Sequence, residues 1–290
     1  MPTLKDKIIL VTGATSGIGE VTARELAKQG AHVVLLARNA EKAEATRRNI
    51  VAAAGHDLVG VLLCDLSDLN QVRKAAETFK RIYPRLDVLV NNAGLLFGTP
   101  RTVSVDGYEM GVATNHLGPF LLTSLLFDEL RKSEDGRIIN VASEAYRFAK
   151  PNIADFQSER HYNPLRVYGN TKLYNIMFTQ ELARQLRDRG ITNVSVNAVH
   201  PGAVASNFGT SSSVLLSTIT KLFRPFMLSV EEGAATSIFL ASEPTCAEVS
   251  GGYFEKKQAK PVKHPFNTLD NAQALWHETE RLVQRNFFQD

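Results

Sequence analysis

The chain has 290 residues, of which 44% are hydrophobic and 22% are charged, a composition typical of an ordinary soluble globular protein. Its 33 basic and 30 acidic side chains give a formal net charge of +3, which indicates neither nucleic acid nor an anionic membrane surface as the main partner. Two cysteines cannot form a disulfide framework or a thiolate metal site, and no apolar run approaches the about 18 to 20 residues of a membrane span. The first residues lack the pattern of a secretory signal, so a cytoplasmic protein is expected.

Short apolar runs alternate with amphipathic stretches along the chain. The predicted strands cover residues 7–12, 32–37, 58–63, 86–90, 137–141 and 194–199. The predicted helices cover residues 17–29, 40–54 and 69–82, and a long helical segment precedes each of the last two strands. Strands that are apolar throughout are typical of a parallel sheet buried on both faces. The repeated units therefore predict a single-domain α/β fold of the Rossmann type, a doubly wound parallel sheet of about seven strands with helices on both faces.

Two segments break this alternation. Residues 144–166 contain prolines, aromatic residues and little periodicity, and residues 203–230 mix serines with aromatic residues. Long irregular segments in a compact α/β domain are typically functional loops, so we expect both to shape a substrate site; the alternative is a surface loop without a role. No linker divides the chain, and residues 1–290 are predicted to form one domain with its dinucleotide-binding part at about 1–145.

A glycine-rich turn follows the first predicted strand and opens the first predicted helix. Glycines allow a tight turn there, and main-chain N–H groups at a helix N-terminus attract a pyrophosphate. The turn therefore predicts dinucleotide binding by Gly13, Thr15, Ser16, Gly17, Ile18 and Gly19.

The ends of the next three strands supply further candidate cofactor ligands. Arg38 and Asn39 follow the second strand, where many NAD-binding proteins carry a carboxylate for the ribose hydroxyls. An arginine can form a bidentate pair with a 2′-phosphate, so NADP(H) is favoured over NAD(H); the alternative is a solvated arginine. The carboxyl ends of parallel strands are where such sheets bind ligands. The candidates at the third and fourth strands are Asp65, Leu66, Asn92, Ala93 and Gly94.

Tyr168 and Lys172 stand four residues apart in a predicted helix, so their side chains lie on the same face. A phenol has an ordinary pKa of about 10, and a neighbouring ammonium favours the phenolate. The pair thus suits an acid that passes a proton to a carbonyl oxygen. On its own the spacing is also typical of an aromatic ring packed under a solvated lysine.

Together these motifs resemble the short-chain dehydrogenase/reductase family over nearly all of the chain. Within the family, the segments 36–39, 115–122, 178–183 and 200–202 are most similar to retinol dehydrogenases and related carbonyl reductases. The residues that match the family pattern are Thr12, Gly13, Gly17, Gly19, Asp65, Asn91, Asn92, Ala93, Gly94, Asn115, Ser143, Tyr168, Lys172, Pro201 and Gly202.

The resemblance implies a role for each of four catalytic residues. Tyr168 would exchange a proton with the substrate oxygen, and Lys172 would lower the pKa of the phenol and hold the nicotinamide ribose. Ser143 would donate a hydrogen bond to the developing alkoxide. Asn115 would anchor a water that links Lys172 to solvent. The residues that would hold the nicotinamide are Pro201, Gly202, Val204 and Ser206.

The sequence therefore predicts an NADP(H)-dependent oxidoreductase that interconverts a ketone or aldehyde and an alcohol on an apolar or aromatic small molecule. Two alternatives are a non-catalytic dinucleotide sensor and an epimerase or lyase that retains NAD on the same fold. No metal site is predicted, because the histidines lack the spacing of metal ligands. A homodimer or a monomer is expected, with no nucleic-acid partner.

Overall fold

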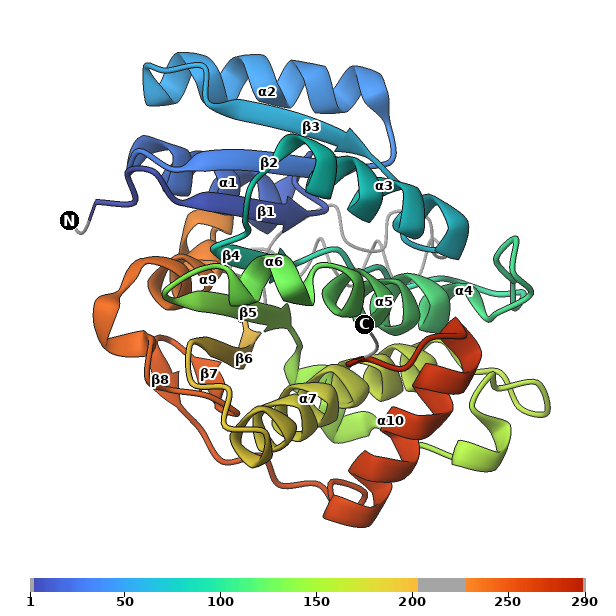
Figure 1. The fold of residues 1–290 in the computed structure, drawn as a ribbon. Coiled ribbons are helices and arrows are strands. Elements are labelled where there is room, and N and C mark those ends of the chain that lie inside the picture. Colours follow the sequence, from blue (N-terminus) through green and yellow to red (C-terminus); the bar gives the residue numbers. More distant parts are fainter. Residues whose placement is uncertain (1–2, 203–227, 289–290) are drawn as a thin grey trace.

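A computed structural model of the chain describes residues 3–202 and 228–288 and shows a layered α/β fold (Figure 1). The described residues form an eight-stranded sheet in the order β3-β2-β1-β4-β5-β6-β7-β8. All neighbouring strands are parallel except β7 and β8, which pair antiparallel. The strands are β1 (Ile8–Thr12), β2 (His32–Ala37), β3 (Val59–Leu63), β4 (Val88–Asn91), β5 (Gly136–Val141), β6 (Val194–His200), β7 (Tyr253–Glu255) and β8 (Gln258–Ala259).

The predicted doubly wound parallel sheet is confirmed, with two short strands that the sequence does not reveal. β7 and β8 have three and two residues, too few to produce an apolar run or an alternation. β7 extends the parallel sheet beside β6, and the exposed β8 turns back along it. The sheet therefore has one strand more than the about seven expected.

Helices cover both faces of the sheet. Alternate residues of one strand point to opposite layers, as Leu10 and Val11 of β1 do, so the central strands are apolar on both sides. Helices α1, α2 and α9 cover one face and α3, α5 and α7 the other, and α10 packs against the outside of α7 (Figure 1). The α-helices are α1 (Gly17–Lys28), α2 (Ala40–Ala54), α3 (Leu69–Ile82), α4 (Met110–Val112), α5 (Gly118–Leu125), α6 (Phe127–Arg131), α7 (Pro164–Asp188), α9 (Val230–Ser242) and α10 (Leu269–Val283).

The long helical segment predicted before β5 is present, but it is not a regular α-helix throughout. α4, the π-helical turn η1 (Ala113–Leu117) and α5 follow one another without a break, and α6 continues after Leu126. Pro119 has no N–H with which to reach the carbonyl of Asn115 four residues earlier, which weakens regular α-helix at this point. The N–H of Gly118 instead reaches back to the carbonyl of Ala113, five residues earlier. Such turns concentrate at functional sites, and this one contains Asn115.

The segment predicted to be irregular, residues 144–166, is partly ordered in short turns. It contains two 3₁₀ turns, η2 (Glu144–Phe148) and η3 (Ile153–Asp155), and the start of α7. Helix α7 begins earlier than expected because Asn163 caps it and Pro164 occupies its first position. Most of the second predicted loop, residues 203–227, lies outside the described residues.

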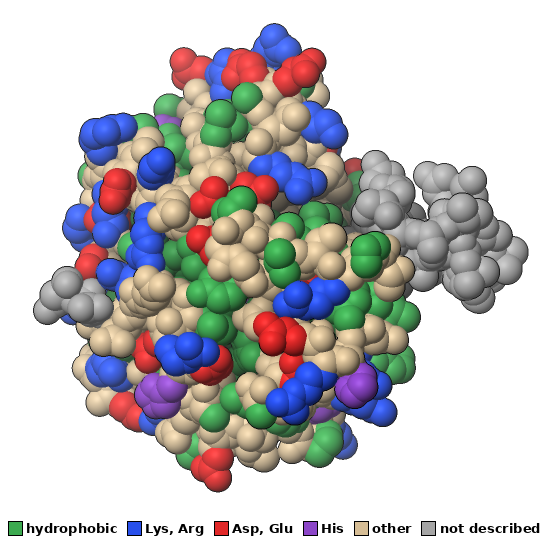
Figure 2. Space-filling model, turned by 90° about the vertical axis from the view of Figure 1, so that its right-hand side faces the viewer, with side chains coloured by type: hydrophobic (Ala, Val, Ile, Leu, Met, Phe, Trp, Pro, Cys, Tyr) green, Lys and Arg blue, Asp and Glu red, His purple; other side chains and the backbone are tan. Residues whose placement is uncertain are grey.

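No helix within residues 3–202 and 228–288 combines the length and apolar character needed to cross a bilayer. The face toward which the strands point carries charged side chains of both signs, with hydrophobic side chains gathered at its middle (Figure 2). That face holds the carboxyl ends of the parallel strands.

Candidate active site

The glycine-rich turn and the loop after β4 are joined at one edge of the sheet. The hydroxyl of Thr12 accepts hydrogen bonds from the main-chain N–H groups of Asn92 and Ala93, each at 2.9 Å. The side-chain amide of Asn92 donates to the main-chain carbonyl of Thr12 at 2.9 Å. These bonds bring the predicted ligands of two separate strands into one cradle.

The cradle has no room for side chains at two of its glycines. Gly13 has φ 63°, and a methyl group there would lie 2.9 Å from the Cα of Ala93. A methyl group on Gly19 would overlap the carbonyl oxygen of Gly13 and the side chain of Asn92. Ser16 precedes α1 without a capping bond from its side chain, so its hydroxyl does not occupy the first N–H groups of the helix. The turn therefore fits a pyrophosphate held by main-chain N–H groups and the helix dipole.

The candidate ligands for the adenosine half lie at the ends of the neighbouring strands β2 and β3. Arg38 is exposed, and within residues 3–202 and 228–288 its guanidinium makes no hydrogen bond or ion pair. Asn39 caps α2 by accepting from the N–H of Lys42 at 2.8 Å, so this predicted ligand also has a structural role. Asp65 accepts from the N–H and hydroxyl of Ser67 at 2.9 and 2.7 Å, which fixes its carboxylate. Leu66 is buried, and its carbonyl contacts Gly118 so closely that a side chain at 118 would overlap it.

Ser143, Tyr168 and Lys172 come together beyond the end of β5. The hydroxyl of Ser143 forms a side-chain hydrogen bond with the phenol of Tyr168. The ammonium of Lys172 lies 5.4 Å from the centre of the Tyr168 ring and donates to the carbonyl of Val141 at 2.9 Å. Gly94 approaches from the β4 loop, where a methyl group would lie 2.9 Å from Lys172 Nζ. The glycine-rich cradle and the predicted catalytic residues are thus adjacent.

Burial shifts the pKa values of both members of the Tyr168–Lys172 pair. It raises the pKa of the Tyr168 phenol, and the hydrogen bond from Ser143 acts in the opposite direction. Burial also lowers the pKa of Lys172 to about 8. Desolvation, rather than the charge of Lys172, is therefore the main influence on the pKa of the phenol.

Asn115 acts as a clamp between the π-helical turn, the β4 loop and α7. Its side-chain oxygen accepts from the N–H of Leu95, and its amide donates to the carbonyl of Leu95, both at 2.9 Å. The amide also donates to the hydroxyl of Thr171 at 3.2 Å, and that hydroxyl donates to the carbonyl of Tyr168 at 2.8 Å. This clamp was missed from the sequence because neither Leu95 nor Thr171 carries a recognisable motif.

Gly169 follows the candidate acid in the middle of α7, where glycine is unfavourable. A methyl group at this position would lie 2.8 Å from the carbonyl oxygen of Ala145 in η2, the turn that begins beside Ser143. The glycine therefore lets η2 lie directly against the helix that carries Tyr168.

Gly169→Ala is expected to destabilise the protein by about 1–3 kcal/mol through overpacking, against a gain of about 1 kcal/mol in helix propensity. Thermal unfolding of the two proteins measures this. A melting temperature equal to or above that of the wild type would show that the close approach does not require glycine.

Pro201 and Gly202 follow β6 at the same edge of the sheet. Gly202 has φ 88°, and a methyl group on it would overlap the side chain of Leu228. Val204 and Ser206, the other two residues predicted to hold the nicotinamide, lie outside the described residues.

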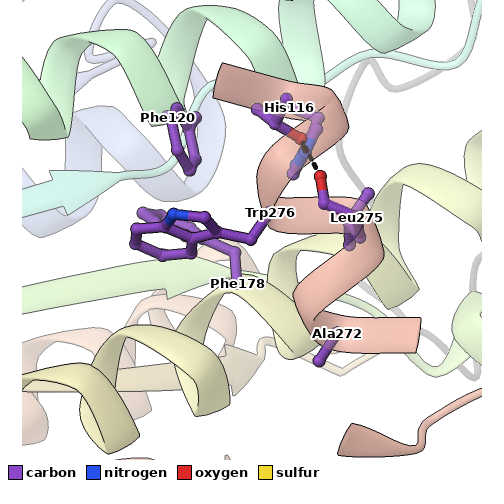
Figure 3. Close-up of a pocket in the computed structure, with 7 residues that line it drawn as sticks. His116, Phe120, Phe178, Ala272, Leu275 and Trp276 are labelled. Carbon is purple, nitrogen blue, oxygen red and sulfur yellow. Dashed lines mark hydrogen bonds between the residues drawn. The ribbon is translucent and has the colours of Figure 1, made fainter. Parts of the chain in front are cut away.

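His116, beside Asn115, is a buried structural residue. Its Nε2 lies 2.9 Å from the hydroxyl of Thr279 on α10, and its Nδ1 lies 3.4 Å from the side-chain oxygen of Asn175 on α7. Burial lowers its pKa to about 4, so the ring is neutral. It also lines a small hollow with the mostly apolar residues Phe120, Phe178, Ala272, Leu275, Trp276 and Thr279 (Figure 3).

Comparison with known proteins identifies the family. The family model described as short chain dehydrogenase matches residues 7–214, which include the glycine-rich turn and all four predicted catalytic residues. The chain belongs to the short-chain dehydrogenase family. Its members are oxidoreductases that act on alcohol and carbonyl groups, so the predicted enzyme class is confirmed.

Within the short-chain dehydrogenases, this chain is similar to retinol dehydrogenases, as the sequence motifs predict. Retinol dehydrogenase 12 of Mus musculus is 38% identical over 277 residues, which are 96% of this chain and 86% of the relative. A solved structure of an uncharacterised protein from Mycobacterium paratuberculosis has a TM-score of 0.78 and 32% identity, covering 100% of this chain and 97% of that one.

Two similar solved structures contain a nicotinamide dinucleotide. A short chain dehydrogenase from Burkholderia cenocepacia in complex with NADP has a TM-score of 0.67 and 25% identity, covering 86% of this chain and 96% of its own. A 3-ketoacyl-(acyl-carrier-protein) reductase from Brucella melitensis complexed with NADH has a TM-score of 0.67 and 27% identity, covering 87% of this chain and 96% of that chain.

Proposed function

We propose that this short-chain dehydrogenase uses NADP(H) to interconvert a ketone or aldehyde and an alcohol on an apolar or aromatic small molecule. The observation that carries the proposal is the meeting of Ser143, Tyr168 and Lys172 beside a cradle that has room only for glycine at Gly13 and Gly19. A non-catalytic dinucleotide sensor would have no need to retain all of these catalytic side chains.

Each catalytic side chain has a defined task at the substrate oxygen. When bound, the nicotinamide supplies or accepts the hydride. Tyr168 donates its phenolic proton to the carbonyl oxygen during reduction and takes it back during oxidation. Ser143 donates a hydrogen bond to the same oxygen and so stabilises its developing charge. Lys172 provides positive charge beside the phenol and binds the ribose.

Asn115 would serve this chemistry by holding the β4 loop and α7 at a constant distance. Its bonds to Leu95 and Thr171 keep Gly94 next to Lys172 and position the turn of α7 that begins at Tyr168. A water anchored near Asn115 would return protons to Lys172 from solvent.

The preference for NADP(H) rests on Arg38, an exposed arginine in place of a carboxylate after β2. Arg38→Leu is expected to weaken NADPH binding by about 10- to 100-fold, because a charge-assisted pair with the 2′-phosphate is lost, and to leave NADH binding unchanged. Titration of protein fluorescence with each cofactor measures both constants. Arg48→Leu, which removes an exposed arginine from the outside of α2, is the control. Equal affinity of the wild type for NADPH and NADH would contradict this role of Arg38.

The apolar character of the substrate is inferred from the hydrophobic side chains at the middle of the face where the strands end (Figure 2). Similarity to retinol dehydrogenase 12 makes retinaldehyde and retinol the first pair to test. A panel of aliphatic, aromatic and polar carbonyl compounds, followed by the absorbance of NADPH, would rank them by kcat/KM. We expect apolar compounds to rank first.

If NADPH binds but no compound is turned over, the non-catalytic sensor becomes the better hypothesis. NAD that stays bound through purification would favour the epimerase or lyase.

A further inference from the structure

A hydrogen-bond network connects the turn after Ser143 to the ends of two strands. The N–H of Glu144 donates to Nδ1 of His200, the last residue of β6, at 3.3 Å. The phenol of Tyr253 on β7 donates to the carboxylate of Glu144 at 3.0 Å. His200 is 8% exposed and Tyr253 is 3% exposed, so both partners are buried ends of neighbouring strands. The network thus connects a short turn to buried residues of the sheet.

This network acts on the peptide unit that carries Ser143. The N–H bound by His200 belongs to the peptide bond between Ser143 and Glu144. Because that peptide is planar, its orientation fixes the ψ angle of Ser143. The hydroxyl of Ser143 also accepts from the N–H of Ala145 at 3.2 Å and bonds to Tyr168. Arg147, in the same turn, forms an ion pair with the carboxylate of Glu144. A rotation of this peptide would therefore displace Ala145 and break one of the two hydrogen bonds that orient the Ser143 hydroxyl toward Tyr168.

We propose that His200 is a positioning residue for the proposed carbonyl–alcohol reaction: its neutral ring accepts from Glu144 and thereby holds Ser143 against Tyr168, while Tyr253 holds the Glu144 side chain. The inference rests on the proposed function. It assigns a task to the histidine before Pro201 and Gly202, which the sequence motifs leave without one.

The network requires one protonation state of His200. An Nδ1 that accepts a hydrogen bond places the single ring proton on Nε2. When the ring is protonated, Nδ1 carries a hydrogen that faces the N–H of Glu144, so the bond is lost. Burial lowers the pKa of His200; the carboxylates of Glu144 and Glu255 raise it, and Arg147 lowers it. The acceptor form therefore prevails at neutral pH and is lost on acidification.

A double-mutant cycle separates this role from a general structural one. His200→Ala is expected to lower kcat by about 10- to 100-fold, as a misplaced catalytic group does. In a Ser143→Ala background the same change is expected to have little further effect, because the group it positions is already absent. Two results would overturn the proposal. One is a double variant whose loss in kcat equals the product of the losses in the two single variants, and the other is a kcat for His200→Ala equal to that of the wild type.

Two conservative variants protect the test against misfolding. Asparagine can place its side-chain oxygen where Nδ1 lies, so His200→Asn should restore most of the activity and lose the acidic decline of kcat with pH. Tyr253→Phe should lower kcat less than His200→Ala does, because it removes only the bond to Glu144. His56→Asn, at the α2–β3 connection near the opposite edge of the sheet, is the matched control and should leave both kcat and its pH profile unchanged. An acidic limb that persists in His200→Asn would contradict the proposal.

A measurement without substrate distinguishes failure of this inference from failure of the proposed function. Nitrogen NMR of uniformly ¹⁵N-labelled protein, assigned with His200→Asn, should show the Nε2–H form of His200 at neutral pH. Its titration should coincide with a shift of the Glu144 amide. An Nδ1–H form would overturn the positioning role even in an active enzyme. Absence of turnover with every carbonyl, together with the Nε2–H form, would contradict the proposed function alone.

Discussion

Tyr168→Phe is expected to lower kcat by about 100- to 10,000-fold, the range typical of the loss of a general acid. Phenylalanine preserves the ring beside Lys172 and removes only the hydroxyl that bonds to Ser143. Binding of NADPH is therefore expected to stay within about threefold of the wild-type constant, which separates chemistry from cofactor binding.

The measurement compares kcat on the best substrate of the carbonyl panel with the fluorescence titration of NADPH. Tyr83→Phe is the matched control, because Tyr83 is also a buried tyrosine but packs beside Gly60 of β3, away from the active site. If Tyr168→Phe turned over substrate at the wild-type rate, the proton would have to come from another group.

Lys172→Met is expected to produce a protein that is inactive but more stable than the wild type. Lys172 is 2% exposed, and a pKa lowered from 10.5 to about 8 corresponds to a penalty on the order of 3 kcal/mol for burying the charge. Methionine fills a similar volume without charge, although the carbonyl of Val141 loses its donor at a cost of about 1 kcal/mol. A net gain of about 1–3 kcal/mol at pH 7 is expected, at the expense of catalysis.

The pH dependence of stability tests the cause of that gain. Below about pH 8 the lysine is charged in both the folded and the unfolded state, and the full penalty applies. Between about pH 8 and 10.5 the folded protein has released a proton that the unfolded chain still binds, so the wild type gains stability relative to the variant. Denaturant unfolding of both proteins across this range should show their difference shrinking. Lys80→Met replaces an exposed lysine on α3, and its stability difference from the wild type should not change with pH in this range. A Lys172→Met protein less stable than the wild type at pH 7 would show that the hydrogen bond outweighs the buried charge.

Much of the frame of the site is predictable because it depends on local patterns. An apolar strand that ends in a glycine-rich turn leads to a helix N-terminus in most contexts, so the cradle around Gly13 and Gly19 follows from the sequence. The spacing of Tyr168 and Lys172 likewise requires only that α7 be helical. The parallel sheet then brings the loops after β1 and β4 together at one edge.

Other features depend on contacts between distant segments and have no local pattern. The helical segment before β5 contains a π-helical turn that an apolar pattern does not reveal, and only the folded chain shows Asn115 clamped to Leu95 and Thr171. The need for glycine at Gly169 likewise arises from η2, which lies more than twenty residues earlier and touches it only after folding.

The sequence by itself determined the fold class, the family and the identity of the side chains that carry the proposed chemistry, because these depend on periodicity, turn residues and short spacings. Only the tertiary structure decided the state in which those side chains are held. Desolvation raises the pKa of Tyr168 and lowers that of Lys172, and the strands β6 and β7 supply the partners that orient the turn after Ser143. Burial and hydrogen-bond geometry are properties of neighbours in space, and the order of residues along the chain does not specify them.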